Sequence, residues 1–272
     1  MGRHVIEALG KARIVIEDGR IIEIGSPMIS YCPLFHKYRG IETLDEQAMR
    51  ENVEFRMRDF GMCTPDREIR MKDFLSFGVS ELLSMALERG MLDAVVIVSD
   101  GAGTVVLSDP EVVQGIGGRI SGMVETEPYD KVIQAIGENR VLDPGTAEID
   151  QLAGVEMAFR MGFQKVGVSV AFAKDALEIR EKFGEKVVIF AVHTTGTNEE
   201  DAETFFDTCD VVTSCASRTI REAAKRKALL QVGSRIPVYA ATELGKRMML
   251  ERLEQIGKEP SDEETDPPRP LI

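Results

Sequence analysis

Short, uniformly apolar runs recur along the chain from residue 94 onward, and they end at polar or glycine-rich residues. The clearest run, VVIFAV at residues 187–192, follows a charged turn and stops at a histidine, two threonines and a glycine. The same pattern recurs in three other places, which are Ala94–Val98, Val166–Val170 and Val211–Thr213. Runs this short and this apolar are typical of strands buried on both faces in the middle of a parallel sheet.

Segments with helical spacing lie between these runs. They are Lys131–Ile136, Ala147–Met161, Asp175–Phe183, Asn198–Thr208, Arg218–Lys227 and Thr242–Gln255. Two further strands are expected at Arg140–Leu142 and Ile236–Ala240. Helices between buried strands indicate right-handed crossovers. We therefore expect an α/β fold with a mostly parallel, twisted sheet flanked by helices.

The first 90 residues predict a small N-terminal lobe made of a β-hairpin and helices. Two alternating runs, Ala12–Ile16 and Ile21–Ile24, are joined by an Asp-Gly turn, which is a strong hairpin signal. One helix is expected over Ile41–Phe60. A second is expected to begin at Thr64, a good N-cap residue before a proline, and to run to about Glu88.

The length of 272 residues suffices for one large α/β domain with a smaller lobe. We expect the lobe over residues 1–90 and the α/β domain over residues 91–257. Acidic residues and prolines gather over residues 258–272. This composition predicts a disordered tail.

Charge and hydropathy exclude several classes of partner. The net charge of −13, from 46 acidic and 33 basic residues, opposes a broad phosphate-backbone interface, so nucleic acid is not expected. No apolar run approaches the roughly 20 residues that span a bilayer, and the N-terminus lacks a secretory apolar segment. We therefore expect a cytoplasmic protein without a membrane partner. The sequence leaves a homo-oligomer open.

Three reactive side chains each follow a predicted strand. Asp100, His193 and Cys215 stand directly after the apolar runs described above or within a few residues of them. Ligands of open α/β sheets collect beyond the carboxyl ends of the strands. If these strands are parallel neighbours, the three side chains share one rim and form a candidate catalytic set. The carboxylate is then a base, and the thiol and imidazole form a nucleophilic pair.

Four cysteines without a close CxxC pair argue against a disulfide framework in a cytosolic chain. Cys32 lies four residues before His36, and Cys215 lies between a predicted strand and helix. Cys63 lies just outside the helix expected to begin at Thr64, where the helix dipole favours a thiolate, so its thiol is expected to be the most acidic. The metal candidates are Cys32, His36, Cys63 and Cys215. They would suit zinc or an iron–sulfur cluster, and simple burial of the thiols is the alternative.

Two glycine-rich loops within twenty residues permit close approach of the backbone to an anion. One loop follows Asp100, the other precedes Arg119, and neither is a complete nucleotide-binding signature. Together with the polar residues after His193, they give a candidate anion-binding set. Its members are Gly101, Gly103, Thr104, Gly115, Gly117, Gly118, Arg119, Thr194, Thr195 and Gly196. The alternative is that the glycines only form turns.

Seven sequence blocks resemble, in matching order, those of an archaeal family called methanogenesis marker protein 8. The blocks are YCPLFHKYRG, FRMRDFGMCTP, LSFGVSELLS, SDGAGTVV, VQGIGGRISG, AVHTTG and CAS. The resemblance covers about residues 3–250. It implies a cytoplasmic protein of methane-forming archaea whose genomic distribution tracks methyl-coenzyme M reductase. It implies no catalytic residue, because the family has no known activity.

Two functions follow from these patterns. The first is an accessory or assembly factor for the methyl-coenzyme M reductase machinery, which handles a metal or cluster through the cysteines. The second is an enzyme that acts on a small anionic metabolite or cofactor precursor, held by the glycine-rich loops. A plain interaction domain without chemistry is a further alternative.

Overall fold

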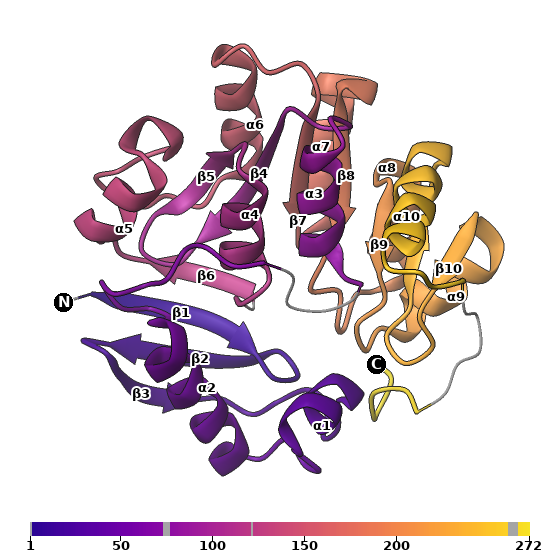
Figure 1. Cartoon of the computed structure of the whole chain (residues 1–272). Helices are drawn as coiled ribbons and strands as arrows, with labels where there is room; N and C mark the ends of the chain where they lie inside the picture. Colours follow the sequence, from indigo (N-terminus) through magenta and orange to yellow (C-terminus); the bar gives the residue numbers. More distant parts are fainter. Residues whose placement is uncertain (1, 73–76, 121, 261–265) are drawn as a thin grey trace.

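The computed structural model describes residues 2–72, 77–120, 122–260 and 266–272. These residues form two β-sheets with helices packed against them, as Figure 1 shows. The smaller sheet has the strand order β3-β2-β1-β6 and is antiparallel. The larger sheet has seven strands in the order β10-β11-β9-β8-β7-β4-β5. The protein is therefore a mixed α/β fold.

The larger sheet is parallel only at its centre. Its strands are β4 (Ala94–Ser99), β5 (Gly103–Leu107), β7 (Val166–Val170), β8 (Val187–Ala191), β9 (Val211–Thr213), β10 (Leu230–Val232) and β11 (Val238–Ala240). The four apolar runs form β4, β7, β8 and β9, which are parallel neighbours. The expectation of a mostly parallel sheet is not confirmed, because the β4–β5, β9–β11 and β10–β11 pairs are antiparallel. At β4–β5 the cause is local. Gly101 and Gly103 adopt positive φ angles, so the chain turns tightly and returns beside β4 without a crossover.

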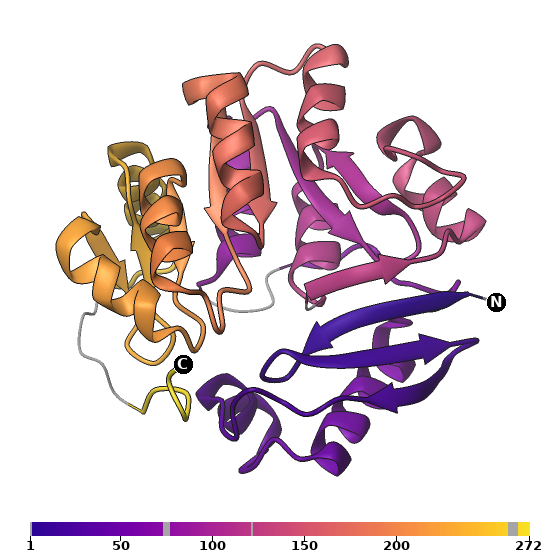
Figure 2. The same cartoon turned by 180° about the vertical axis from the view of Figure 1, so that it is seen from behind.

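Helices cover both faces of the larger sheet. On one face lie α3 (Val79–Glu88), α4 (Pro110–Gly117), α5 (Asp130–Ile136) and α10 (Glu243–Gln255). On the other lie α6 (Gln151–Arg160), α7 (Ala173–Phe183), α8 (Glu199–Thr208) and α9 (Arg218–Lys227), seen from their side in Figure 2. Alternate residues of β4, such as Val95 and Val96, pack into the two different cores, as expected for a strand buried on both faces. Among the described residues, no helix combines the length and the apolar character needed to cross a membrane.

The smaller sheet lies against the carboxyl ends of the parallel strands (Figures 1 and 2). It consists of β1 (Arg3–Ala8), β2 (Ala12–Glu17), β3 (Arg20–Ile24) and β6 (Gly122–Thr126). Two helices belong to this region, α1 (Pro33–Arg39) and α2 (Glu46–Phe60). The isoleucines of β1 and β2, among them Ile6 and Ile14, pack against Met49 and Val53 of α2. This arrangement places a second sheet over the edge where the sequence predicts ligand binding.

The helix expected from Thr64 to Glu88 forms only as α3. Thr64 does not cap a helix: its hydroxyl donates to the Gly61 carbonyl and accepts from the Asp66 amide, which closes a turn. The backbone of Cys63 has a φ of 57°, which a right-handed helix does not allow. The turn holds the Cys63 amide against Asp100, so a tertiary contact replaces the local signal. Residues 73–76 of the expected helix lie outside the described residues.

Two other local expectations differ from the structure. The glycine-rich segment before Arg119 contains α4, because Asp109 caps it and Pro110 occupies its first turn. Residues 140–142 form no strand: the segment is a 3-10 turn over Glu138–Arg140, followed by a single bridge between Val105 and Val141.

Residues 266–272 make specific contacts, although the sequence predicts disorder over 258–272. Arg269 exchanges backbone hydrogen bonds with Tyr31, and the Ile272 amide donates to the Ala216 carbonyl. The Tyr31 hydroxyl also donates to the Asp266 carboxylate. These contacts join the segment to the loop before α1 and to the loop after β9. The acidic residues 261–265 lie outside the described residues, so disorder there stays a prediction.

Candidate functional site

A cavity of about 170 Å³ lies between the two sheets and is lined by two of the four cysteines. Cys32 precedes α1 beside the smaller sheet, and Cys215 lies between β9 and α9 of the larger one. His193, Glu7 and Lys11 line the same space. We call this space the thiol cavity. Its walls come from segments far apart in the chain, as expected for a site at the carboxyl edge of the sheet.

His193 stands just beyond β8 and is held by the smaller sheet. Its Nε2 atom lies 2.8 Å from Oε2 of Glu7 in β1. This hydrogen bond lowers the pKa of the Glu7 carboxyl below its ordinary value, with a smaller contribution from the charge of Lys11. Lys11 also donates to the Thr195 carbonyl. No described residue forms a hydrogen bond with Nδ1 of His193, so that nitrogen is the one left for a ligand or a thiol.

Four residues that line the thiol cavity have strained backbones with positive φ: Leu9, Lys11, His193 and Cys215. His193 has a φ of 60° and Cys215 a φ of 41°, both in the left-handed region that side chains other than glycine rarely adopt. The surrounding bonds hold the Cys215 turn in place: Arg221 donates to the Cys215 carbonyl, and the Ala216 amide donates to the Thr195 hydroxyl. Such strain is found most often at active sites and ligand clamps.

The cysteines differ in exposure. Cys215 is half-buried, whereas Cys32, Cys63 and Cys209 are buried. Burial raises the pKa of the Cys32 thiol and raises that of Cys63 well above its ordinary value. The same effect raises the pKa of Cys209 to about 12. The expectation that Cys63 is the most acidic cysteine is therefore wrong, because no helix begins beside it and its thiol is fully desolvated.

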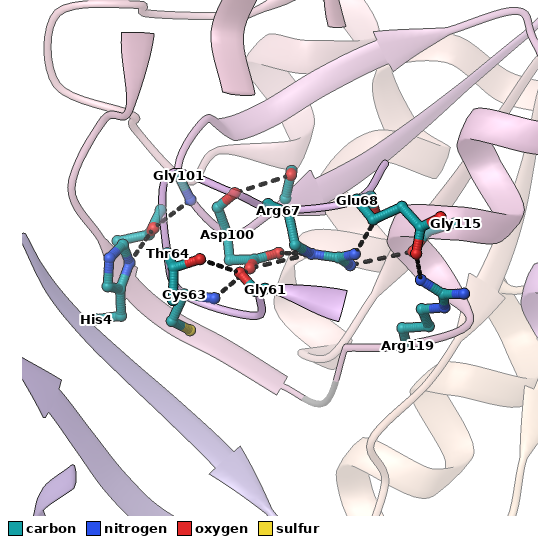
Figure 3. Close-up of polar contacts among 12 residues, drawn as sticks. His4, Gly61, Cys63, Thr64, Arg67, Glu68, Asp100, Gly101, Gly115 and Arg119 are labelled. Carbon is teal, nitrogen blue, oxygen red and sulfur yellow. Dashed lines mark hydrogen bonds and ion pairs between the residues drawn. The ribbon is translucent and has the colours of Figure 1, made fainter. Parts of the chain in front are cut away.

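Asp100 lies in a separate buried cluster, shown in Figure 3. Its carboxylate accepts a hydrogen bond of 2.6 Å from the Cys63 amide and one of 2.9 Å from Nε of Arg67. Both charged side chains are 0% exposed. Arg67 also donates to the carbonyls of Glu68 and Gly115. Asp100 therefore ties the 61–68 turn to β4 and does not line the thiol cavity.

A buried histidine connects this cluster to the smaller sheet. His4 of β1 contacts the Thr126 hydroxyl through Nδ1 at 2.7 Å and the Tyr129 hydroxyl through Nε2 at 2.9 Å. The Thr126 hydroxyl in turn accepts from the Gly101 amide, and the Tyr129 hydroxyl donates to the Cys63 carbonyl. Burial lowers the pKa of the His4 imidazole.

This shift predicts a pH dependence of stability. At pH values just below about 6.5 the unfolded chain binds a proton at His4 whereas the folded protein does not, so the free energy of unfolding falls as the pH drops. We expect a slope of up to about 1.4 kcal/mol per pH unit from this group in that range. His4→Gln is expected to flatten the curve in urea denaturation between pH 7 and pH 5.5, and the exposed His36→Gln should leave it unchanged. Parallel curves for wild type and His4→Gln would contradict this.

The predicted metal residues are not gathered into one set. Cys32 and Cys215 line the thiol cavity, whereas Cys63 is in the Asp100 cluster. His36 is exposed on α1, where its Nδ1 lies 3.3 Å from the Tyr31 hydroxyl. Across the described ranges, no group of three or more His, Cys, Asp or Glu residues is arranged to hold a metal ion. Zinc or cluster binding therefore has no support in this geometry.

Most of the predicted anion-binding residues have structural contacts. A Cβ atom added to Gly103 or Gly115 would lie 2.2 Å from the carbonyl oxygens of Ala147 or Ile69, so close packing requires glycine. Gly101 and Gly196 have positive φ. The three threonine hydroxyls are all engaged in hydrogen bonds. Thr104 accepts from the Asp150 amide, Thr194 donates to the Thr213 carbonyl, and Thr195 accepts from the Ala216 amide. Gly117 and Gly118 end α4, and each lines a different cavity. Arg119 and Gly118 line the same cavity, away from the other glycines of the set.

Several residues of the site carry no clear sequence signal. Glu7 and Lys11 lie at the end of β1 and in the following turn, in a stretch that reads only as scaffold. Gly122 of β6 lies against His193, where an added Cβ would be 2.6 Å from Nε2. Residues 3–8 read RHVIEA and do not alternate regularly between apolar and polar, so the pattern gave no sign of the strand that brings Glu7 to His193.

Comparison with known proteins places the candidate site, apart from Pro268, within a defined family. A family model described as an uncharacterized protein conserved in archaea (DUF2099) matches residues 4–254. An uncharacterized protein of Methanocaldococcus jannaschii is 43% identical over 265 residues, which cover 95% of this chain and 93% of that relative. The Asp100 cluster falls inside the matched segment. The residues of the thiol cavity do so too, except for Pro268. The chain belongs to this uncharacterized family conserved in archaea.

Proposed function

We propose that this protein is an enzyme that acts on a small molecule through the thiol of Cys215. The observation that supports this most strongly is the thiol cavity itself, where Cys215, Cys32 and His193 line one space of about 170 Å³. Clefts at the carboxyl edge of a sheet are the usual binding sites of α/β enzymes. The small volume favours a metabolite over a macromolecule.

The residues of the cavity supply the parts of a thiol nucleophile. Cys215 is the half-buried cysteine and sits on a strained turn. His193 is the base: it takes the thiol proton at Nδ1 as sulfur adds to a carbonyl carbon of the substrate and the π electrons of that carbonyl move to its oxygen. Glu7 fixes the ring through Nε2 and stabilises the imidazolium that results. Cys32 is a second thiol beside the reacting one, kept protonated by burial.

Reaction with iodoacetamide tests this assignment. We expect Cys215 to be alkylated first in the folded wild type, whereas Cys63 and Cys209 stay unmodified because burial keeps them as thiols. Removal of the base in His193→Gln should slow alkylation of Cys215 by about 10-fold or more, within the range of general-base effects. Peptide mapping by mass spectrometry at pH 7 gives the rate at each cysteine.

The control for this test is His36→Gln, which removes an exposed imidazole outside the thiol cavity. Its rates should match the wild type. Equal alkylation rates at Cys215 in wild type and His193→Gln would refute the base role. Preferential labelling of Cys63 would refute the choice of nucleophile.

The cellular setting is a separate proposal. The resemblance to methanogenesis marker protein 8 and the relative in Methanocaldococcus jannaschii support a role beside the methyl-coenzyme M reductase machinery. Anaerobic affinity purification from a methane-forming archaeon tests it directly. Retained reductase subunits would support this setting, and their absence from repeated preparations would count against it. Neither result depends on the thiol chemistry.

A further inference from the structure

A second cavity, beside α1 and α2, gathers three arginines. It has a volume of about 210 Å³, and Arg39, Arg56 and Arg119 all line it. They come from α1, from α2 and from the residues after α4, so three separate elements converge there. We call this space the arginine cavity. It shares Leu34 and Phe35 with the thiol cavity, so the two spaces are neighbours.

Aromatic rings hold the three guanidinium groups in place. The guanidinium carbon of Arg39 lies 3.8 Å from the ring centre of Phe55. The corresponding distance is 5.7 Å from Arg56 to Phe35 and 4.9 Å from Arg119 to Phe60. Stacking on a ring does not block the N–H donors at the edge of a guanidinium, and Arg119 already uses two of its donors on Sδ of Met71 and Oε2 of Glu68. Such groups suit a planar or tetrahedral oxyanion.

The charge at this site is unusual for the chain. Burial and the nearby charge of Arg39 lower the pKa of Arg56 to about 10, which still leaves this side chain protonated at neutral pH. Three positive charges therefore surround one space in a protein with a net charge of −13. Among the described residues, two carboxylates oppose them. Glu68 pairs with Arg119 at 2.9 Å but is 59% exposed, and Asp59 lines the cavity as an exposed residue. Water screens exposed carboxylates, so a positive potential remains inside.

A buried amide supplies an independent sign of a ligand. Asn52 of α2 lines the arginine cavity, and its side-chain Oδ1 atom is buried without a hydrogen-bond partner among the described residues. Asn52 as a whole is only 5% exposed. Buried polar atoms of this kind are rare in native proteins, because each costs free energy unless it is bonded. The unpaired Oδ1 atom is an acceptor, so it would bond a hydroxyl of the ligand, such as the protonated oxygen of a phosphate monoanion.

We propose that the arginine cavity binds an oxyanion, a carboxylate or a phosphate, carried on an apolar or aromatic body. The arginines bind the anionic group, Asn52 bonds one of its polar atoms, and the body packs on Phe35, Phe60 and Ile120. This inference does not depend on the thiol chemistry of Cys215. If both proposals hold, the adjoining walls at Leu34 and Phe35 make an anionic substrate the natural ligand of the thiol cavity as well.

Isothermal titration with phenylphosphonate tests the proposal, because this probe carries an oxyanion on an aromatic ring. We expect the wild type to bind it more tightly than inorganic phosphate or benzyl alcohol, each of which has only one of the two features. Arg56→Gln is expected to weaken binding at least 10-fold, as for loss of a charge-assisted hydrogen bond. Arg39→Gln, at an exposed position that should tolerate the change, is expected to weaken it in the same direction.

The matched control is Arg58→Gln, which removes the same charge from an exposed position of the same helix outside the cavity. Its affinity for phenylphosphonate should equal that of the wild type. No binding by the wild type, or equal loss in Arg39→Gln and Arg58→Gln, would overturn the proposal. Iodoacetamide rates at Cys215 in the same variants keep this result separate from the thiol assignment, since those rates should not change.

Discussion

Replacing Asp100 with alanine is expected to lower the free energy of unfolding by about 3–5 kcal/mol. The substitution leaves the Arg67 guanidinium 0% exposed without its counter-charge, and it leaves the Cys63 amide without an acceptor. A buried charge without a partner is among the largest single destabilising changes. Urea denaturation at pH 7.5 measures the loss, and a loss below about 1 kcal/mol would contradict the structural role of Asp100.

Two further variants separate burial from charge. Asp66→Ala removes an exposed carboxylate that pairs with Lys131, and it is expected to change stability by less than about 1 kcal/mol. The double substitution Asp100→Ala with Arg67→Met removes both buried charges. It should be less destabilising than the sum of the two single substitutions, because neither charge is then left alone. Additive losses would show that the two side chains do not act as a pair.

Replacing Gly122 with alanine is expected to displace His193 and to abolish the preferred reactivity of Cys215. An added Cβ would lie 2.6 Å from Nε2 and 2.8 Å from Cδ2 of the imidazole, which is closer than side chains approach. The ring must move, and the 2.8 Å hydrogen bond to Glu7 is lost with it. We expect iodoacetamide to modify Cys215 at least 10-fold more slowly, as in His193→Gln. Overpacking should also lower stability by about 1–3 kcal/mol.

The matched control for this prediction is Gly117→Ala. Gly117 lines a neighbouring cavity with Gly122, but its added Cβ would meet Ser80 and Ile97 at 3.5 and 3.6 Å, which are ordinary contacts. This variant should keep the wild-type alkylation rate. If Gly122→Ala also keeps it, the position of His193 does not control the thiol.

The central strands and several helices could be predicted from the sequence because their signals are local. The apolar runs of β7, β8 and β9 form strands with nearly the predicted bounds, and the helices expected from Asn198 and from Thr242 begin there, with these two residues as N-caps. The antiparallel edges could not be derived in this way. Pairing of β6 with β1 joins residues more than 110 positions apart, and no pattern in either segment specifies that partner.

The candidate site was predictable only in part, for the same reason. Parallel neighbours bring His193 and Cys215 to one cavity, as the strand order allows. Asp100 follows a strand of the same group, yet a buried arginine from the 61–68 turn binds its carboxylate. Glu7 meets His193 from 186 positions away, so only the packing of one sheet on the other could reveal that contact.

The segment at residues 266–272 has a consequence for how ligands reach the thiol cavity. Pro268 forms part of the wall, Arg269 is joined to the strand-like residue Tyr31, and Ile272 is joined to Ala216 beside Cys215. The segment thus connects the two sides of the thiol cavity. A motion that parts these two sides to admit a ligand would first have to break the hydrogen bonds of the segment, and ligand association by that route would be no faster than their rupture.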